Sequence, residues 1–97
     1  MKLVWTESAR DDLRDIFTYI VQENPSAARR LLSLIREKAT ALTENPDIGR
    51  IGRIEGTREL VLSGTHYILP YRISGQQIQI LAVLHGARQW PDQFINY

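Results

Sequence analysis

The sequence predicts an α+β domain in which an N-terminal strand and an antiparallel helical hairpin pack on a small antiparallel β-sheet. Two observations predict this class. In the first half of the chain, apolar residues recur every three or four positions, which is the period of an amphipathic helix. In the second half, short strand-like segments are separated by glycine-containing turns. A chain of 97 residues can build one thin hydrophobic core, so we expect a single domain over residues 1–97.

The chain is expected to open with a strand and a helix. Residues 2–5 form a short apolar run, which predicts the first strand. The period then changes, because the apolar residues between 9 and 21 fall on one stripe of a helix. Thr6 or Ser8 is the predicted N-cap, since a hydroxyl there can accept a hydrogen bond from the first turn.

A second helix is expected immediately afterwards. Asn24-Pro25 ends the first helix and begins the second, because proline is tolerated in the first turn. The second apolar stripe spans residues 28–42, and the short link between the helices predicts an antiparallel hairpin. Residues 45–56 are irregular, and their glycines predict either close backbone approach or positive φ.

Three further strands are predicted over residues 57–62, 66–73 and 77–84. Ser-Gly pairs mark the turns between them, and such short links favour an antiparallel meander. Pro70 lies within the second of these strands and has no N–H to donate. We therefore expect that strand to lie at an edge of the sheet or to carry a bulge at Pro70.

Composition narrows the classes of function. The chain has no cysteine and two histidines, so we expect no zinc site, no other metal and no cofactor. No apolar run is long enough to span a bilayer, and we expect a cytoplasmic protein with no membrane partner. The net charge of +1 is too small for strong non-specific binding to DNA.

Arginines dominate the basic residues of the second half of the chain. Residues 49–97 contain five basic and three acidic residues, and all five basic residues are arginine. Arginine offers a planar fork that suits phosphate and also stacks on rings. We predict Arg50, Arg53, Arg58 and Trp90 as binding residues, although a hydrophobic plug is the more usual role of such a tryptophan.

A second group of residues has the chemistry of a catalytic site. If the protein is a nuclease, we predict Arg72, His85 and Arg88 as its catalytic residues. The arginines would stabilise a charged transition state, and the imidazole would transfer a proton. Structural roles remain open, because Arg72 could pair with Glu59 or Glu55 across the sheet, and His85 could cap its strand.

The chain resembles the RelE/ParE toxins of bacterial toxin–antitoxin modules over nearly its whole length. The resemblance rests on Thr6-Glu7-Ser8-Ala9, Gly56-Thr57-Arg58-Glu59-Leu60, the Tyr-x-x-x-Tyr-Arg strand at 67–72 and Val83-Leu84-His85-Gly86-Ala87-Arg88. The last of these motifs is the most specific. The fold that the resemblance implies agrees with the class predicted from periodicity.

The resemblance implies a growth-inhibiting toxin that forms a complex with a cognate antitoxin protein. RelE-type members cut mRNA on the ribosome, whereas ParE-type members poison DNA gyrase and need no nuclease site. In RelE-type members an arginine follows the first tyrosine of the strand at 67–72, where this chain has Ile68. The ending from His85 to Arg88 is more similar to ParE-type members. DNA gyrase is therefore the favoured target over the ribosome with mRNA, and whether the protein is an enzyme depends on that choice.

Overall fold

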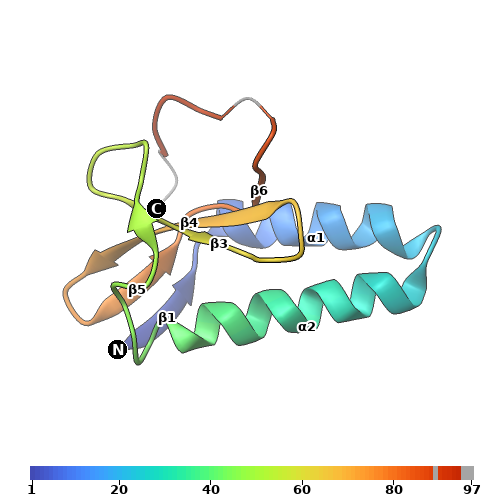
Figure 1. The fold of residues 1–97 in the computed structure, drawn as a ribbon, viewed down its shortest axis with the longest axis horizontal. Helices are drawn as coiled ribbons and strands as arrows, with labels where there is room; N and C mark the ends of the chain where they lie inside the picture. Colours follow the sequence, from blue (N-terminus) through green and yellow to red (C-terminus); the bar gives the residue numbers. More distant parts are fainter. Residues whose placement is uncertain (89, 95–97) are drawn as a thin grey trace.

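The computed structural model describes residues 1–88 and 90–94, which form two helices and a six-stranded sheet (Figure 1). The elements in chain order are β1 (Lys2–Trp5), α1 (Glu7–Val21), α2 (Pro25–Ala41), β2 (Arg50–Ile51), β3 (Arg58–Val61), β4 (Tyr67–Ser74), β5 (Gln77–Ile80) and β6 (Leu84–His85). This is the predicted α+β class, and the two helices run side by side as the predicted hairpin.

Local capping sets where both helices begin. The hydroxyl of Thr6 accepts the backbone N–H of Ala9 at 3.2 Å and donates to the carbonyl of Ile80 at 2.8 Å. Thr6 is therefore the N-cap of α1 and also joins that helix to β5. Asn24 caps α2 by accepting the N–H of Ala27 at 3.0 Å, and Pro25 follows as the first helical residue.

The sheet is mixed rather than wholly antiparallel. Its order is β1-β5-β4-β3-β2, with β6 pairing to β4 beyond the end of β5. The pairings of β3 with β4 and of β4 with β5 are antiparallel, as the short turns predicted. β2 was not predicted, since it lies in the segment expected to be irregular, and it pairs antiparallel with β3. β1 runs parallel to β5. The helical hairpin and the following strands separate these two in sequence, which gives the chain the length that a parallel pairing requires.

The predicted strand at 77–84 is interrupted. β5 ends where Ile80 pairs with Tyr71, and pairing resumes where Leu84 of β6 faces Ile68. Two residues of β4, 69 and 70, thus face three residues, 81–83, between β5 and β6. The segment 81–83 therefore contains the one extra residue of a β-bulge. Pro70 lies here on an internal strand, so its expected edge position was wrong, while the expected irregularity is present. Its carbonyl accepts the N–H of Leu81 at 2.9 Å.

The core lies between the helices and one face of the sheet, and Tyr71 anchors it to the irregular segment after α2. Tyr71 is fully buried on β4. Its hydroxyl donates to the carbonyl of Pro46 at 2.6 Å and accepts the N–H of Gly49 at 3.0 Å. A Cβ on Gly49 would come within 2.6 Å of the Tyr71 ring, so this position requires glycine for close approach. Burial raises the pKa of the Tyr71 hydroxyl.

Removing this hydroxyl should destabilise the protein. We expect Tyr71→Phe to lower the free energy of unfolding by about 1–3 kcal/mol, because the buried N–H of Gly49 and carbonyl of Pro46 lose their partner. Urea unfolding at neutral pH measures the change. Tyr19→Phe is the matched control, since Tyr19 is 75% exposed. Equal stabilities for Tyr71→Phe and wild type would contradict this role.

Candidate functional site

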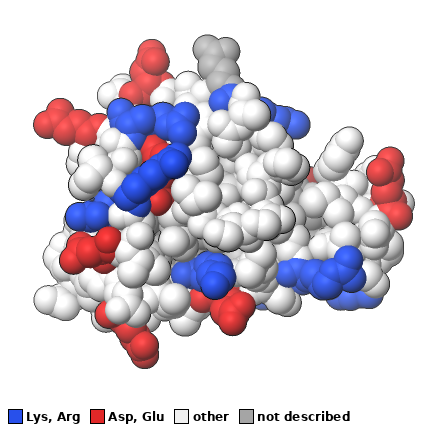
Figure 2. All heavy atoms as spheres, in the orientation of Figure 1, with Lys and Arg blue, Asp and Glu red and all other residues white. Residues whose placement is uncertain are grey.

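A buried carboxylate fixes two of the predicted binding arginines on the sheet face opposite the helices. Glu59 is only 2% exposed. Its Oε1 accepts the Nε and Nη2 of Arg50 at 3.0 and 2.9 Å. Its Oε2 accepts the backbone N–H of Arg53 at 2.8 Å and the Nε of Arg53 at 3.2 Å. Basic side chains accordingly gather over β2 and the loop that follows it, with acidic atoms among them (Figure 2).

The charge state of Glu59 follows from these contacts. Burial alone would raise the pKa of its carboxyl, but the backbone N–H of Arg53 and the two guanidinium groups outweigh burial and lower this pKa below its ordinary value. The side chains of Arg50 and Arg53 are about half exposed, at 54% and 45%. Glu59 therefore stays ionised at neutral pH, and its two partners face outward.

Trp90 joins the C-terminal segment to this cluster. The guanidinium carbon of Arg53 lies 3.5 Å from the centre of the Trp90 ring, a cation–π contact. The indole N–H of Trp90 is 3.4 Å from the carbonyl of His85. Figure 1 shows the chain after β6 passing above the sheet, on the opposite side from α2. Trp90 thus lies against Arg53, which the sequence could not establish.

His85 is packed among aromatic rings at the start of this segment. Its ring stacks on His66 with centroids 5.2 Å apart and meets the edge of Tyr67 at 5.8 Å. Its Nδ1 accepts the N–H of Ala87 at 3.2 Å. The hydrogen bond at Nδ1 is of the kind that the strand-capping role requires, whereas proton transfer would use the other ring nitrogen, Nε2.

Arg88 lines a hollow between α1 and β6. This hollow has a volume of about 450 Å³ and is lined by Asp12, Asp15, Ile16, Tyr19, Tyr67, Val83, Leu84, His85 and Arg88. Asp12 accepts the N–H of Val83 at 3.0 Å. Burial raises the pKa of the Asp12 carboxyl, and the charges of Asp15 and Asp11 raise it further. The hollow therefore combines both signs of charge.

Arg72 lies away from the other two predicted catalytic residues. His85 pairs with Tyr67, and Arg72 follows further along the same strand, roughly 16 Å away at the usual rise per strand residue. The Nε of Arg72 donates to the side chain of Gln79. The three predicted catalytic residues are therefore not brought together: Arg88 is near His85, and Arg72 is at the other end of β4.

The side chains of Arg58 and Ile68 make contacts within the fold. Arg58 points to the helix side, where it donates to the carbonyl of Gly49 at 2.8 Å and forms an ion pair with Asp47 at 3.7 Å. It therefore holds the segment before β2. Ile68 is buried at 7% exposure, and a Cβ on Gly86 would meet its side chain at 3.1 Å. Gly86 thus packs closely over Ile68.

Glu59 is the site residue whose role the sequence did not predict. It was considered only as a partner for Arg72, whereas its hydrogen bonds go to Arg50 and Arg53. The one available signal was an acidic residue directly before the apolar run of residues 60–62. That signal does not identify the partners, because the pairing of Arg50 with Glu59 depends on strand register.

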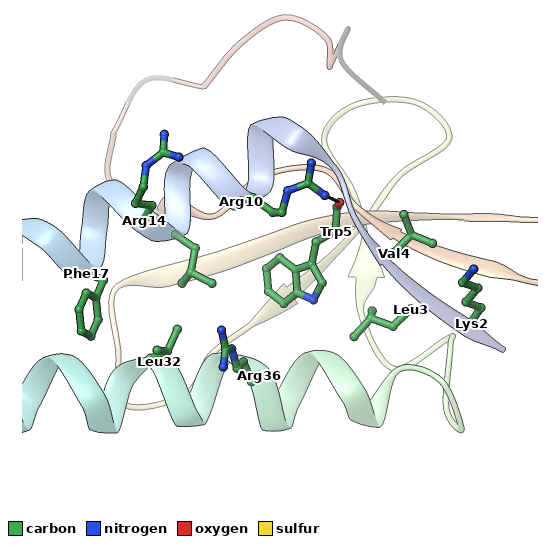
Figure 3. Close-up of a pocket in the computed structure, with 10 residues that line it drawn as sticks. Lys2, Leu3, Val4, Trp5, Arg10, Arg14, Phe17, Leu32 and Arg36 are labelled. Atoms are coloured by element: carbon green, nitrogen blue, oxygen red, sulfur yellow. Dashed lines mark hydrogen bonds between the residues drawn. The ribbon is translucent and has the colours of Figure 1, made fainter.

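An apolar groove with a basic rim lies between β1 and the two helices (Figure 3). Its volume is about 670 Å³, and its lining residues are Lys2, Leu3, Val4, Trp5, Arg10, Leu13, Arg14, Phe17, Leu32 and Arg36. Arg10 donates to the carbonyl of Trp5 at 2.9 Å, which fixes it beside β1. Sequence periodicity assigned Leu13 and Phe17 to a buried stripe, but part of that stripe lines an open groove.

Within residues 1–88 and 90–94, no group of three or more histidine, aspartate or glutamate side chains is placed to hold a metal ion. Neither helix in the described part of the chain has the length and apolar character needed to cross a membrane.

Comparisons with known proteins agree with this fold. Residues 3–90 match the family described as "ParE toxin of type II toxin-antitoxin system, parDE". A candidate toxin of Sinorhizobium fredii, Y4kP, is 46% identical over 93% of both chains. Toxin RelE2 of Caulobacter vibrioides is 34% identical over 90% of this chain and 97% of its own.

A solved structure gives the same result. A chain from the structure titled "Chromosomal ParDE TA system from P. aeruginosa" superposes with a TM-score of 0.77 at 32% identity, covering 86% of this chain and 92% of that one. The match covers most of both chains, so it extends well beyond a shared motif. The protein therefore belongs to the ParE toxin family of type II toxin–antitoxin systems.

Proposed function

We propose that this toxin inhibits growth by binding DNA gyrase, in the cytoplasm, and does not cut RNA. The observation that carries the proposal is the placement of Arg72. A nuclease of this kind needs cations and a proton-transfer group around one phosphate, yet Arg72 and His85 are separated by roughly 16 Å along β4. Ile68, at the position where the resemblance implies a nuclease arginine, is buried beneath Gly86.

The exposed cluster on the opposite face suits a binding role. Glu59 holds both Arg50 and Arg53, and Trp90 lies against Arg53. Arginine and tryptophan are among the residue types that dominate binding energy at protein interfaces. Binding requires a shaped surface but no proton transfer. One relative is named toxin RelE2, and RelE-type members cut mRNA. RNA cleavage is therefore the alternative against which the proposal is tested.

We further propose that the groove between β1 and the helices receives the antitoxin. Its apolar floor includes Leu13, Phe17 and Leu32, which a helical segment with one apolar face could cover. Its rim carries Arg14, Arg36 and other basic side chains, and this favours a segment whose polar face is acidic. Such a segment could fold as it binds.

This location bears on how the antitoxin would neutralise the toxin. Direct masking of the arginine-bearing surface would need contacts between residues 50 and 90, but the residues that line the groove lie between 2 and 36. An antitoxin in the groove would cover the target-binding cluster only by continuing around the sheet. Hydrogen exchange of the complex would report which surfaces become protected.

The choice of mechanism can be tested with site variants. We expect His85→Gln to retain growth inhibition within about tenfold of wild type, because a binding surface loses no proton-transfer step, whereas a nuclease would lose about 10²–10³ in rate. Arg88→Ala combined with Trp90→Ala should reduce inhibition more, because Trp90 supports Arg53. Controlled expression measures toxicity, and purified gyrase with plasmid DNA measures accumulation of cleaved DNA.

The opposite mechanism has a distinct signature. Primer extension on mRNA from arrested cells should show no cuts at codon positions in the ribosome. Codon-positioned cuts that disappear with folded His85→Gln protein would contradict gyrase binding and establish RNA cleavage.

The groove can be tested by charge reversal on its rim. Arg36→Glu should slow association with the cognate antitoxin by about tenfold at low salt, with a smaller effect at high salt, because an acidic segment would then be repelled. Stopped-flow mixing or surface plasmon resonance measures this rate. Arg29→Glu is the matched control, since Arg29 is exposed on the same helix but does not line the groove. Equal association rates for the two variants would exclude the groove as the docking site.

A further inference from the structure

The arrangement around Glu59 leaves guanidinium N–H groups directed away from the carboxylate. Arg50 uses its Nε and Nη2 on Glu59, and Arg53 uses its Nε. Within residues 1–88 and 90–94, the Nη1 of Arg50 and both Nη atoms of Arg53 make no hydrogen bond. Each arginine has five N–H donors, so both keep donors for a ligand while their orientation is fixed.

Stability alone is a weak explanation for this cluster. Burying a carboxylate costs several kcal/mol in desolvation, which paired arginines only roughly offset. What the contacts do provide is geometry. One carboxylate holds two half-exposed guanidinium groups from β2 and the following loop, and one of these guanidinium groups also lies over Trp90.

We propose that Glu59 is a positioning residue that presets Arg50 and Arg53 as a paired site for nucleic-acid phosphates, with Trp90 beside it as a base-stacking surface. The inference rests on the proposed function, in which the target complex contains DNA. Guanidinium forks match phosphate oxygens, and an indole ring stacks on bases. A net charge of +1 keeps such binding weak in isolation, so the site would act within the target complex.

Charge and orientation predict opposite effects of changing Glu59. If Glu59 acts only through its negative charge, Glu59→Gln should tighten phosphate binding, and Glu59→Asp should leave it unchanged. If Glu59 orients the arginines, both variants should weaken binding. Glu55→Gln is the matched control, because Glu55 is exposed in the same loop and its change removes the same charge.

The experiment uses the purified toxin and a short fluorescein-labelled single-stranded DNA, followed by anisotropy at low salt. We expect Glu59→Asp and Glu59→Gln each to weaken binding by about tenfold, as for the loss of one charge-assisted hydrogen bond, while Glu55→Gln binds as tightly as wild type or more tightly. An RNA of the same sequence distinguishes the two sources of phosphate, and tighter DNA binding is expected. Affinity for the antitoxin should not change, because the groove is elsewhere.

A direct readout covers the case in which Glu59 variants fail to fold. On adding the oligonucleotide to wild type, the NMR signals of the Arg50 and Arg53 Nε–H groups and the Trp90 indole N–H should shift. Arg53→Lys, which keeps the charge but loses the fork, should weaken binding. The proposal is overturned if Glu59→Gln binds as tightly as Glu55→Gln, if Arg53→Lys binds like wild type, or if those signals do not move. Because these measurements contain no gyrase, failure of the gyrase proposal would be seen separately.

Discussion

The ion pairs and hydrogen bonds of the Glu59 carboxylate are the interactions on which the arrangement of the arginine-bearing surface depends. A buried charge must be compensated, and here the compensation comes from two arginines that lie nine and six residues before Glu59. Arg50 brings β2 to the sheet, the backbone N–H of Arg53 shapes the loop, and the Arg53 side chain supports Trp90. A single side chain on β3 therefore organises an edge strand, a loop and the C-terminal segment.

The other face of the sheet is held by apolar packing rather than by ion pairs, and the two faces carry separate surfaces. There the helices bury an apolar core, and the hydroxyl of Tyr71 ties the segment after α2 to the centre of β4. The groove lies beside this core, between β1 and the helices, whereas the arginine cluster lies on the far side. An antitoxin in the groove and a target at Glu59 would contact different elements of the fold. Neutralisation would then require either a long antitoxin segment or a change transmitted through the sheet.

The sequence predicted what depends on local chemistry. The helical stripes, the cap at Thr6, the start of the second helix at Asn24-Pro25 and the strand turns are set within a few residues, and the structure has them. The parallel pairing of β1 and the break between β5 and β6 depend on contacts distant in sequence, so periodicity could not give them. The same limit applies to the site. Arg50, Arg53 and Trp90 were identified as residue types, but their meeting point at Glu59 depends on register and on the path of the C-terminal segment.

Strand register also determines which of the predicted catalytic residues lie close together. Arg72 and His85 both belong to the β4 region, but β6 pairs with the beginning of β4 and Arg72 lies near its end. The bulge opposite Pro70 lets β6 follow β5 along the same strand, and this fixes His85 beside His66 and Tyr67. Moving Arg72 to His85 would require a shift of several residues along β4, which would exchange buried and exposed side chains along the strand. The core holds this register, so Arg72 stays near the end of β4 while His85 pairs with its beginning.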